Sequence, residues 1–201
     1  MRLLIFSDIH SDHRALERLM ATDADYYIAA GDLVSWARGL DRAGEIMQPK
    51  ADRVLVIPGN HESASDIAVF CAKFGFTDLH GGSRQFGRWH VAGLGHSSPT
   101  PFDTPGEYSE DEIARRLAPF TAVDPLILVC HCPPKPSLLD QSRDGQNHFG
   151  STAVAAFLKA KQPRYFFCGH VHEAEGAVEQ LGATTGVNVG KAGYLLDLAK
   201  L

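Results

Sequence analysis

The stretch Leu3-Leu4-Ile5-Phe6-Ser7-Asp8-Ile9-His10 places a carboxylate and an imidazole directly after a short apolar run. Later apolar runs also give way to glycine or polar residues that include candidate metal ligands. Short apolar runs interleaved with helical patterns are typical of buried strands in an α/β sheet. The other runs, each with its motif, are Tyr26–Ala30 with Gly31-Asp32, Val54–Ile57 with Gly59-Asn60-His61, Leu126–Cys130 with His131, and Tyr165–Phe167 with Gly169-His170-Val171-His172.

The positions of these motifs predict that their side chains gather at one place. In open α/β sheets the ligand crevice lies at the carboxyl ends of the strands. Candidate ligands that follow different strands therefore converge in space, although they lie far apart in the sequence.

The chemistry of the candidate ligands narrows the choice of metal. Imidazole, carboxylate and amide groups without a thiolate suit Mn, Fe, Zn, Co or Ni better than calcium or a thiolate-bound ion. The set is larger than one tetrahedral zinc ion needs, and the Asp32 carboxylate can bridge two cations through its two oxygens. Two ions about 3.5–4 Å apart would polarise a phosphoryl oxygen and lower the pKa of a bound water to about 7. That water becomes hydroxide near neutral pH.

The ordered motifs D-x-H, GD, GNH, H and GHxH resemble those of the calcineurin-like metallophosphoesterase superfamily. This superfamily also contains purple acid phosphatases, protein serine/threonine phosphatases, cyclic-nucleotide phosphodiesterases and some nucleases. The resemblance covers Asp8 to His172, and no member of the motif set is missing. The sequence around His131-Cys132-Pro133-Pro134 also looks like a small prokaryotic branch of phosphoesterases.

The resemblance implies a role for each matched residue. His61 stands beside a ligand and is similar to the family's histidine that contacts phosphate and protonates the leaving oxygen. The nucleophile implied by the family is a metal-bound hydroxide in line with the leaving group. The implied ligands are Asp8, His10, Asp32 and His172 for the first ion, and Asp32, Asn60, His131 and His170 for the second.

Each motif taken alone has a second interpretation. Asp8 and His10 also fit a helix-capping pair, because Asp and Ser favour N-caps. Asp32 and Asn60 also fit turn residues beside glycine. His131 also fits a hydrogen-bonded core histidine. The occurrence of all the motifs in order, each after an expected strand, favours the metal site.

Apolar residues at helical spacing predict helices in the intervening segments. The last part of the chain predicts two strands around Gly190-Lys191-Ala192. The expected helices are Ala15–Met20, Leu40–Met47 ended by Pro49, Ile67–Phe74, a helix capped by Ser109 that runs through Leu117, and one capped by Ser151. The further expected strands are Trp89–Leu94, Thr184–Val189 and Tyr194–Leu198.

The expected fold class is α/β. The resemblance implies a four-layer αββα sandwich in which two mixed β-sheets pack face to face and are flanked by helices. The late strand pair fits the second of these sheets. The length of 201 residues suits a single metallophosphoesterase domain spanning 1–201.

Composition and charge favour a compact enzyme with a small substrate. The apolar fraction of 44% is typical of a globular protein. The net charge is −5, from 19 basic and 24 acidic residues, and no cluster of Lys or Arg is present. Binding along a nucleic-acid backbone therefore has little electrostatic support. The apolar stretch that ends at Phe6 is too short for a secretory signal, and no run approaches a membrane span, so a cytoplasmic location is expected.

The cysteines leave two interpretations open. Cys71, Cys130, Cys132 and Cys168 form no C-x-x-C pair and no disulfide-rich spacing. The latter three flank motif positions, which admits thiolate ligation or redox control. A role as small buried apolar residues in a reducing compartment is favoured.

Two loops are candidates for substrate selection. The segment His96–Pro105 is stiffened by prolines and follows an expected strand, which suits either a wall of the crevice or a plain surface connection. The segment Cys132–Gly150 begins directly after His131, so part of it lies near the metals. The candidate substrate contacts are Asn60, His61, His96, Lys135, Arg143 and His148.

Three classes of function fit the sequence. The favoured one is a dinuclear metal-dependent phosphoesterase that hydrolyses a small phosphoester, with a nucleotide-type phosphodiester ahead of a monoester. The second is a nuclease with the same chemistry, which the acidic charge disfavours. The third is a non-catalytic scaffold, which the complete ligand set argues against. The native metal, the physiological ester and the oligomeric state stay open.

Overall fold

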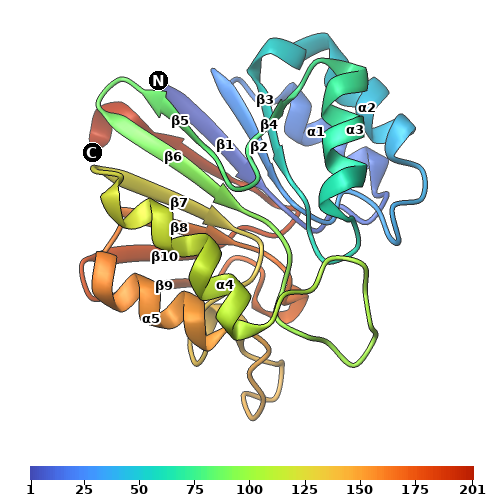
Figure 1. Ribbon diagram of the computed structural model, residues 1–201. Coiled ribbons are helices and arrows are strands. Elements are labelled where there is room, and N and C mark those ends of the chain that lie inside the picture. The colour runs from blue at the N-terminus through green and yellow to red at the C-terminus, as the bar shows by residue number, and fades with distance from the viewer.

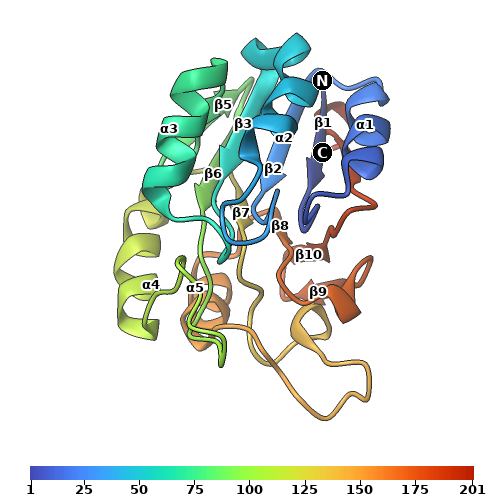
Figure 2. The same ribbon diagram turned by 90° about the vertical axis from the view of Figure 1, so that its right-hand side faces the viewer.

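The computed structural model describes residues 1–201 as two mixed β-sheets packed face to face with helices on both outer faces (Figure 1). Turned by 90°, the molecule is seen from the side that points to the right in Figure 1 (Figure 2). The predicted four-layer αββα sandwich is confirmed. No helix combines the length and the apolar character that a bilayer crossing requires.

The first sheet has the strand order β11-β1-β2-β3-β4. Its central strands are parallel and are buried except at the first residue of β1 and of β2, which explains their continuous apolar sequences. Only β11 runs antiparallel, beside β1. The strands are β1 (Arg2–Phe6), β2 (Tyr26–Ala30), β3 (Val54–Ile57), β4 (Thr77–Asp78) and β11 (Tyr194–Asp197).

The second sheet has the strand order β5-β6-β7-β8-β10-β9. Strands β6, β7, β8 and β10 are parallel, and the edge strands β5 and β9 are antiparallel to their neighbours. The strands are β5 (Ser83–Phe86), β6 (Trp89–Leu94), β7 (Leu126–Cys130), β8 (Tyr165–Cys168), β9 (Val178–Leu181) and β10 (Thr184–Asn188).

Helices α1, α2 and α3 cover the first sheet, and α4 and α5 cover the second (Figure 1). Ser63, Ser109 and Ser151 cap α3, α4 and α5 with their hydroxyl groups, as N-cap serines do. The helices are α1 (His13–Ala21), α2 (Leu40–Met47), α3 (Ala64–Phe74), α4 (Glu110–Leu117) and α5 (Thr152–Lys161). Short 3-10 helices span Gln48–Arg53, Ala118–Ala122, Leu138–Asp140, His172–Ala174 and Leu198–Lys200.

Apolar side chains fill each of the three spaces between the four layers. One cluster joins the first sheet to α1, α2 and α3, and another joins the second sheet to α4 and α5. The middle cluster lies between the two sheets and contains Ile5, Ile28 and Ile57 from the first, with Val129 and Phe167 from the second. This middle layer fixes how the carboxyl ends of the two sets of strands face each other.

One part of the fold prediction is wrong. The expected late strands do form, but only β10 lies in the second sheet, whereas β11 pairs with β1 in the first. The turn at Gly190–Gly193 carries the chain between the sheets, and the backbone N–H of Ser7 donates to the carbonyl of Gly190. The apolar pattern of a strand does not specify its sheet. Strands β4, β5 and β9 were not expected, because they are short or polar edge strands.

A buried carboxylate ties the carboxyl ends of β2 and β3 together. Glu62 accepts hydrogen bonds from the backbone N–H groups of Asp32, Val34 and Gly59 at 2.8–3.0 Å, and its side chain has no exposure to solvent. Burial, and then the charge of Asp32, raise the pKa of Glu62 to about 8, while the backbone donors act in the opposite direction. Glu62 thus satisfies backbone donors that have no strand partner.

We expect Glu62→Gln to lower the free energy of unfolding by about 1–3 kcal/mol, because the amide nitrogen cannot accept a hydrogen bond and leaves a buried donor without a partner. Urea unfolding of chelator-treated protein, followed by circular dichroism, measures this change. Glu45→Gln is the matched control, since Glu45 is exposed and pairs only with Arg42. Equal unfolding midpoints for the two variants would contradict the role of Glu62.

Candidate metal centre

The motif residues gather where the strands of both sheets end, as the sequence predicts. Asp8 follows β1, Asp32 follows β2, and Asn60 follows β3, while His131 and His170 follow β7 and β8. Several of these residues hold the left-handed backbone conformation that non-glycine residues rarely adopt. The values of φ are 57° at Asp8, 44° at His10, 53° at Asp32 and 70° at His170. Such strain costs about 1–3 kcal/mol per residue and is concentrated at functional sites.

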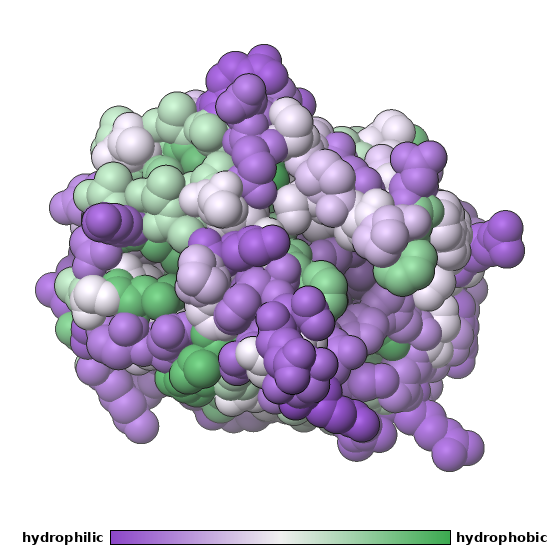
Figure 3. Space-filling model, turned by 90° about the horizontal axis from the view of Figure 1, so that it is seen from below, coloured by the Kyte–Doolittle hydropathy of each residue, from purple (hydrophilic) through white to green (hydrophobic).

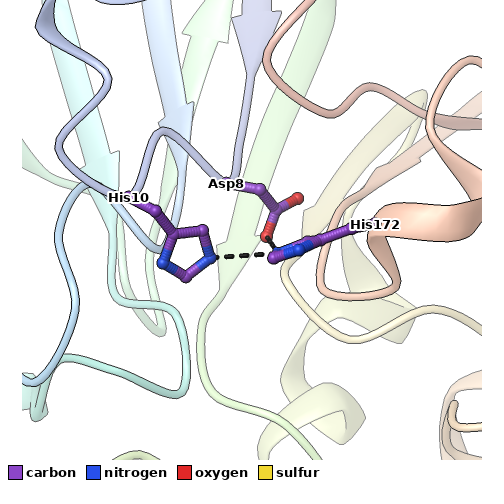
Figure 4. Close-up of side chains that lie close together, drawn as sticks. All are labelled: Asp8, His10 and His172. Atoms are coloured by element: carbon purple, nitrogen blue, oxygen red, sulfur yellow. Dashed lines mark hydrogen bonds and ion pairs between the residues drawn. The ribbon is translucent and has the colours of Figure 1, made fainter.

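Asp8, His10 and His172 form one group of facing ligand atoms (Figure 4). The Nε2 atoms of His10 and His172 lie 3.0 Å apart, and His172 Nε2 lies 3.6 Å from Asp8 Oδ1. Ser35 contacts the other ring nitrogen of His10 at 3.0 Å. The backbone N–H of His170 donates to both Asp8 oxygens at 3.1 Å, which fixes the carboxylate.

Asn60, His131 and His170 form a second group. Asn60 Oδ1 lies 3.2 Å from His131 Nε2 and 2.9 Å from His170 Nδ1. His131 Nδ1 lies 2.8 Å from the carbonyl oxygen of Ala30 and donates to it. This bond leaves Nε2 of neutral His131 free as a ligand, which is how ligating histidines are usually oriented.

The Asp32 carboxylate lies between the two groups. Its Oδ2 atom is 3.5 Å from His10 Nε2 in one group and 3.5 Å from His131 Nε2 in the other. The other oxygen, Oδ1, accepts a hydrogen bond from the backbone of His61 at 3.0 Å. Asp32 therefore lies close to both groups.

The donor set fits divalent cations. Two ligands about 2.0–2.2 Å from one ion lie roughly 3 Å or a little more apart at ordinary coordination angles. The distances in both groups, 2.9–3.6 Å, fall in this range. The donors are nitrogen and oxygen only, which suits Mn, Fe, Zn, Co or Ni. The four cysteines are buried and belong to none of the candidate ligand groups.

Three glycines of the motifs are required by close packing around the candidate ligands. A Cβ at Gly59 would collide with the Asp32 carboxylate, and one at Gly169 would collide with Asp8 and Ser7. Gly31 has φ of 97°, and a Cβ there would lie 2.6 Å from His131 Nδ1. Each of these glycines therefore makes room for a ligand that comes from another motif.

The buried charges shift the pKa values of the ligands in opposite directions. Burial lowers the pKa of His131, but the nearby Asp32 carboxylate outweighs it and raises that pKa to about 9. Burial, and then the charge of His131, lower the pKa of His170 to about 4. Burial raises the pKa of Asp32, but His131 and His10 bring it below its usual range on balance. These groups form one strongly interacting electrostatic unit.

His61 lies at the edge of the centre. The backbone N–H of Trp36 donates to its Nδ1 at 3.4 Å, so the proton of the neutral ring stands on Nε2. The ring packs edge-on against His10 with centroids 5.1 Å apart. A ligand atom of His61 also lies within 4.8 Å of ligand atoms of His10 and Asp32. His61 is thus placed to donate a hydrogen bond to a group held at the centre.

A chain of side chains connects Asn60 to the loop after β6. The Asn60 amide nitrogen donates to the Thr104 hydroxyl at 3.1 Å, and that hydroxyl donates to Glu107 at 2.5 Å. The backbone N–H of Thr104 and the hydroxyl of Thr100 donate to the same Glu107 oxygen, at 2.9 and 2.6 Å. This arrangement holds the amide nitrogen of Asn60 away from the ligands and its oxygen toward them.

The metal centre opens into a cleft of about 600 Å³. The two loops considered from sequence form its walls, through Ser98–Phe102 on one and Lys135 with His148–Gly150 on the other. Figure 3 looks at this end of the molecule, where the surface is mostly hydrophilic with separate hydrophobic spots. The residues of the centre that line the cleft are His10, Asp32, Asn60, His61, His170 and His172.

Of the candidate substrate contacts, Asn60, His61, Lys135 and His148 line the cleft, whereas His96 and Arg143 do not. Its ring packs against Tyr108 and His80 with centroids 4.4 and 5.2 Å apart. Burial, and then the charge of His80, lower its pKa to about 3. The structure therefore places His96 among packed aromatic rings.

Sequence reasoning did not identify Glu62, Thr104 or Glu107 as parts of the site. Glu62 follows His61 directly, so its position beside a motif was an available signal. Thr104 lies 44 positions from Asn60, and no local pattern connects the two.

Comparison with known proteins agrees with this geometry. The family model for calcineurin-like phosphoesterases matches residues 1–174. The uncharacterized protein MJ1162 of Methanocaldococcus jannaschii is 25% identical over 205 residues, which cover 98% of this chain and 91% of that protein. TT1561 of Thermus thermophilus has a similar structure, with a TM-score of 0.72, 21% identity, and coverage of 94% of this chain and 88% of that one.

A dimetal phosphatase from Danio rerio also has a similar fold, with a TM-score of 0.63, 14% identity, and coverage of 93% of this chain and 86% of that one. The family model spans most of the chain, and the motif residues meet at the ends of the strands. The chain belongs to the calcineurin-like phosphoesterase family.

Proposed function

We propose that this protein is a dinuclear metal-dependent phosphoesterase that hydrolyses a small phosphodiester of nucleotide type. The observation that carries the dinuclear proposal is Asp32, whose Oδ2 lies 3.5 Å from a histidine of each ligand group. A carboxylate in this position suits a bridge between two cations. The similar fold of a dimetal phosphatase supports the same proposal.

The residues that would hold the ions divide around Asp32. Asp8, His10, Asp32 and His172 would hold the first ion. When bound, Mn, Fe or Zn ions, or alternatively Ni or Co, would polarise a phosphoryl oxygen and supply a water-derived nucleophile for in-line attack. The residues for the second ion are Asp32, Asn60, His131 and His170.

His61 is the proposed catalytic residue. Its Nε2 carries the proton in the neutral ring, because Nδ1 accepts from the backbone of Trp36. From the edge of the cleft Nε2 would hydrogen-bond the phosphoryl group, and the protonated form of the ring would give its Nε2 proton to the departing oxygen and become neutral. The P–O bond to the leaving group breaks as that proton is transferred.

The cleft supports a small substrate with an apolar, flat substituent. Phe102 is 72% exposed and Phe149 is 50% exposed, and both line the cleft from different loops. Exposed aromatic rings beside a phosphate site suit stacking of a nucleobase. The net charge of −5 disfavours a long nucleic acid, because a polymer needs many phosphate contacts.

We expect the purified protein to bind two divalent transition ions per chain. The physical reason is the division of the ligand set around one shared carboxylate. Elemental analysis of anaerobically purified and reconstituted protein, together with anomalous scattering from crystals, measures stoichiometry and position. A fully active chain that holds a single ion would refute the bridging role of Asp32.

We also expect bis(p-nitrophenyl) phosphate to be hydrolysed at least as efficiently as p-nitrophenyl phosphate when Mn is added. The open cleft leaves room for a second ester group beside the centre. Comparison of kcat/KM for the two substrates tests the ester class. A strong preference for the monoester would indicate a phosphatase, and equally efficient digestion of long DNA would indicate a nuclease.

Substitutions at two adjacent residues separate metal binding from proton transfer. We expect Asn60→Ala to lower metal occupancy and His61→Ala to leave it unchanged. His61→Ala should slow the hydrolysis of esters with poor leaving groups by about 10²–10⁴-fold, the usual contribution of a general acid. The loss of rate should be smaller for esters of p-nitrophenol, because p-nitrophenolate departs without a proton.

Both variants are compared at saturating metal after circular dichroism has shown that they are folded. Equal losses on good and poor leaving groups, with both ions retained, would leave His61 as an electrostatic contact to phosphate and remove its acid role. Loss of an ion from the His61→Ala variant would instead indicate that His61 is a metal ligand.

A further inference from the structure

A second histidine lines the cleft and hydrogen-bonds a buried carboxylate. His148 Nδ1 lies 2.6 Å from Asp140 Oδ1, in the loop between β7 and α5. The Asp140 side chain is completely buried, whereas the His148 side chain is 28% exposed and lines the cleft. The pair therefore runs from the protein interior to the wall of the substrate cleft.

The Asp140 carboxylate is held rigidly by its surroundings. It accepts hydrogen bonds from the backbone N–H of Ser137 at 2.8 Å and of Gly150 at 2.9 Å. These donors fix both carboxylate oxygens, so the direction of the bond to His148 is fixed as well. A carboxylate acceptor keeps the proton on Nδ1 and leaves Nε2 as the free nitrogen of the ring.

The surroundings of His148 suit a substrate group that lies beyond the scissile bond. The ligands of the metal centre come from the strand ends, whereas His148 comes from the loop that also presents Lys135 and Phe149 to the cleft. Glu173 adds one negative charge to the lining. The His148 ring hydrogen-bonds the side chain of Asp140 and none of the candidate ligands of the metal centre.

We propose that His148, oriented by Asp140, accepts a hydrogen bond through Nε2 from a hydroxyl of the second ester group of a phosphodiester substrate, such as a sugar hydroxyl of a nucleotide. This inference rests on the proposed function and names a specificity contact within the same cleft. Asp140 is the positioning residue, because it touches His148 and not the substrate. Phe149, the next residue, brings an exposed ring to the same side of the cleft.

Two diesters with the same leaving group test the contact. Bis(p-nitrophenyl) phosphate and thymidine 5′-(p-nitrophenyl) phosphate both release p-nitrophenolate, but only the second carries a sugar. We expect His148→Ala to lower kcat/KM for the thymidine ester about tenfold, mainly through KM, which corresponds to the loss of one hydrogen bond. The change for bis(p-nitrophenyl) phosphate should be less than about twofold, and metal occupancy should not change.

His90→Ala is the matched control, since His90 is a partly exposed histidine in β6 and does not line the cleft. It should leave both substrates unaffected. Asp140→Asn should reproduce the selective loss on the thymidine ester, and the double variant should lose no more than His148→Ala. A purely structural role for the pair would instead slow both diesters equally.

A binding measurement keeps this inference separate from the proposed function. In protein labelled with ¹⁵N-histidine, we expect His148 to carry its proton on Nδ1 and its Nε2 resonance to shift when thymidine 5′-monophosphate is added. Lack of hydrolysis of every ester by the reconstituted enzyme would refute the proposed function, while a shift of Nε2 would still support the contact. No shift, together with equal kinetic effects on both diesters, would overturn it.

Discussion

The apolar layer between the two sheets is the constraint on which the site depends. Each ligand group combines residues from both sheets, so its geometry holds only while this layer fixes their separation. Hydrogen bonds cross the same boundary: His131 of the second sheet donates to the carbonyl of Ala30 in the first, and the N–H of His170 donates to Asp8. Burial of Ile5, Ile28 and Phe167 between the sheets therefore determines which side chains can meet at their carboxyl ends.

Around this layer the structure stores unfavourable local features at the candidate ligands. Asp8 and Asp32 are buried carboxylates on left-handed backbone, close to each other and to several histidines. Buried charges are costly unless they are paired or coordinate a metal. Glu62 accepts hydrogen bonds from backbone N–H groups and so holds the strand ends in place, but it does not neutralise the buried carboxylates of Asp8 and Asp32. Asp32 takes part in both features: its backbone N–H donates to Glu62, and its carboxylate is a candidate cation ligand.

Much of this arrangement follows from the sequence, and the remainder has identifiable causes. Strands β2, β3, β6 and β7 have the predicted bounds, because continuous apolar runs between glycines and polar residues are strong signals. The sheet to which β11 belongs was mispredicted, because strand pairing depends on contacts far along the chain. The link between Asn60 and Thr104 was not predicted for the same reason. The left-handed backbone at Asp8 and His170 was not predicted either, because residue type is only a weak signal, although Asp and His adopt this conformation more often than most residues.

The connection from Glu107 through Thr104 to Asn60 has a consequence for how this fold can change its substrates. The loop that carries Phe102 forms a wall of the cleft, and it is also the support of a candidate ligand. Replacement of the whole loop, by evolution or by grafting from a relative, would alter ion affinity together with substrate preference. New specificities are therefore accessible at Pro99 and at Pro101–Asp103 without disturbing the centre, provided that Thr100, Thr104 and Glu107 are retained.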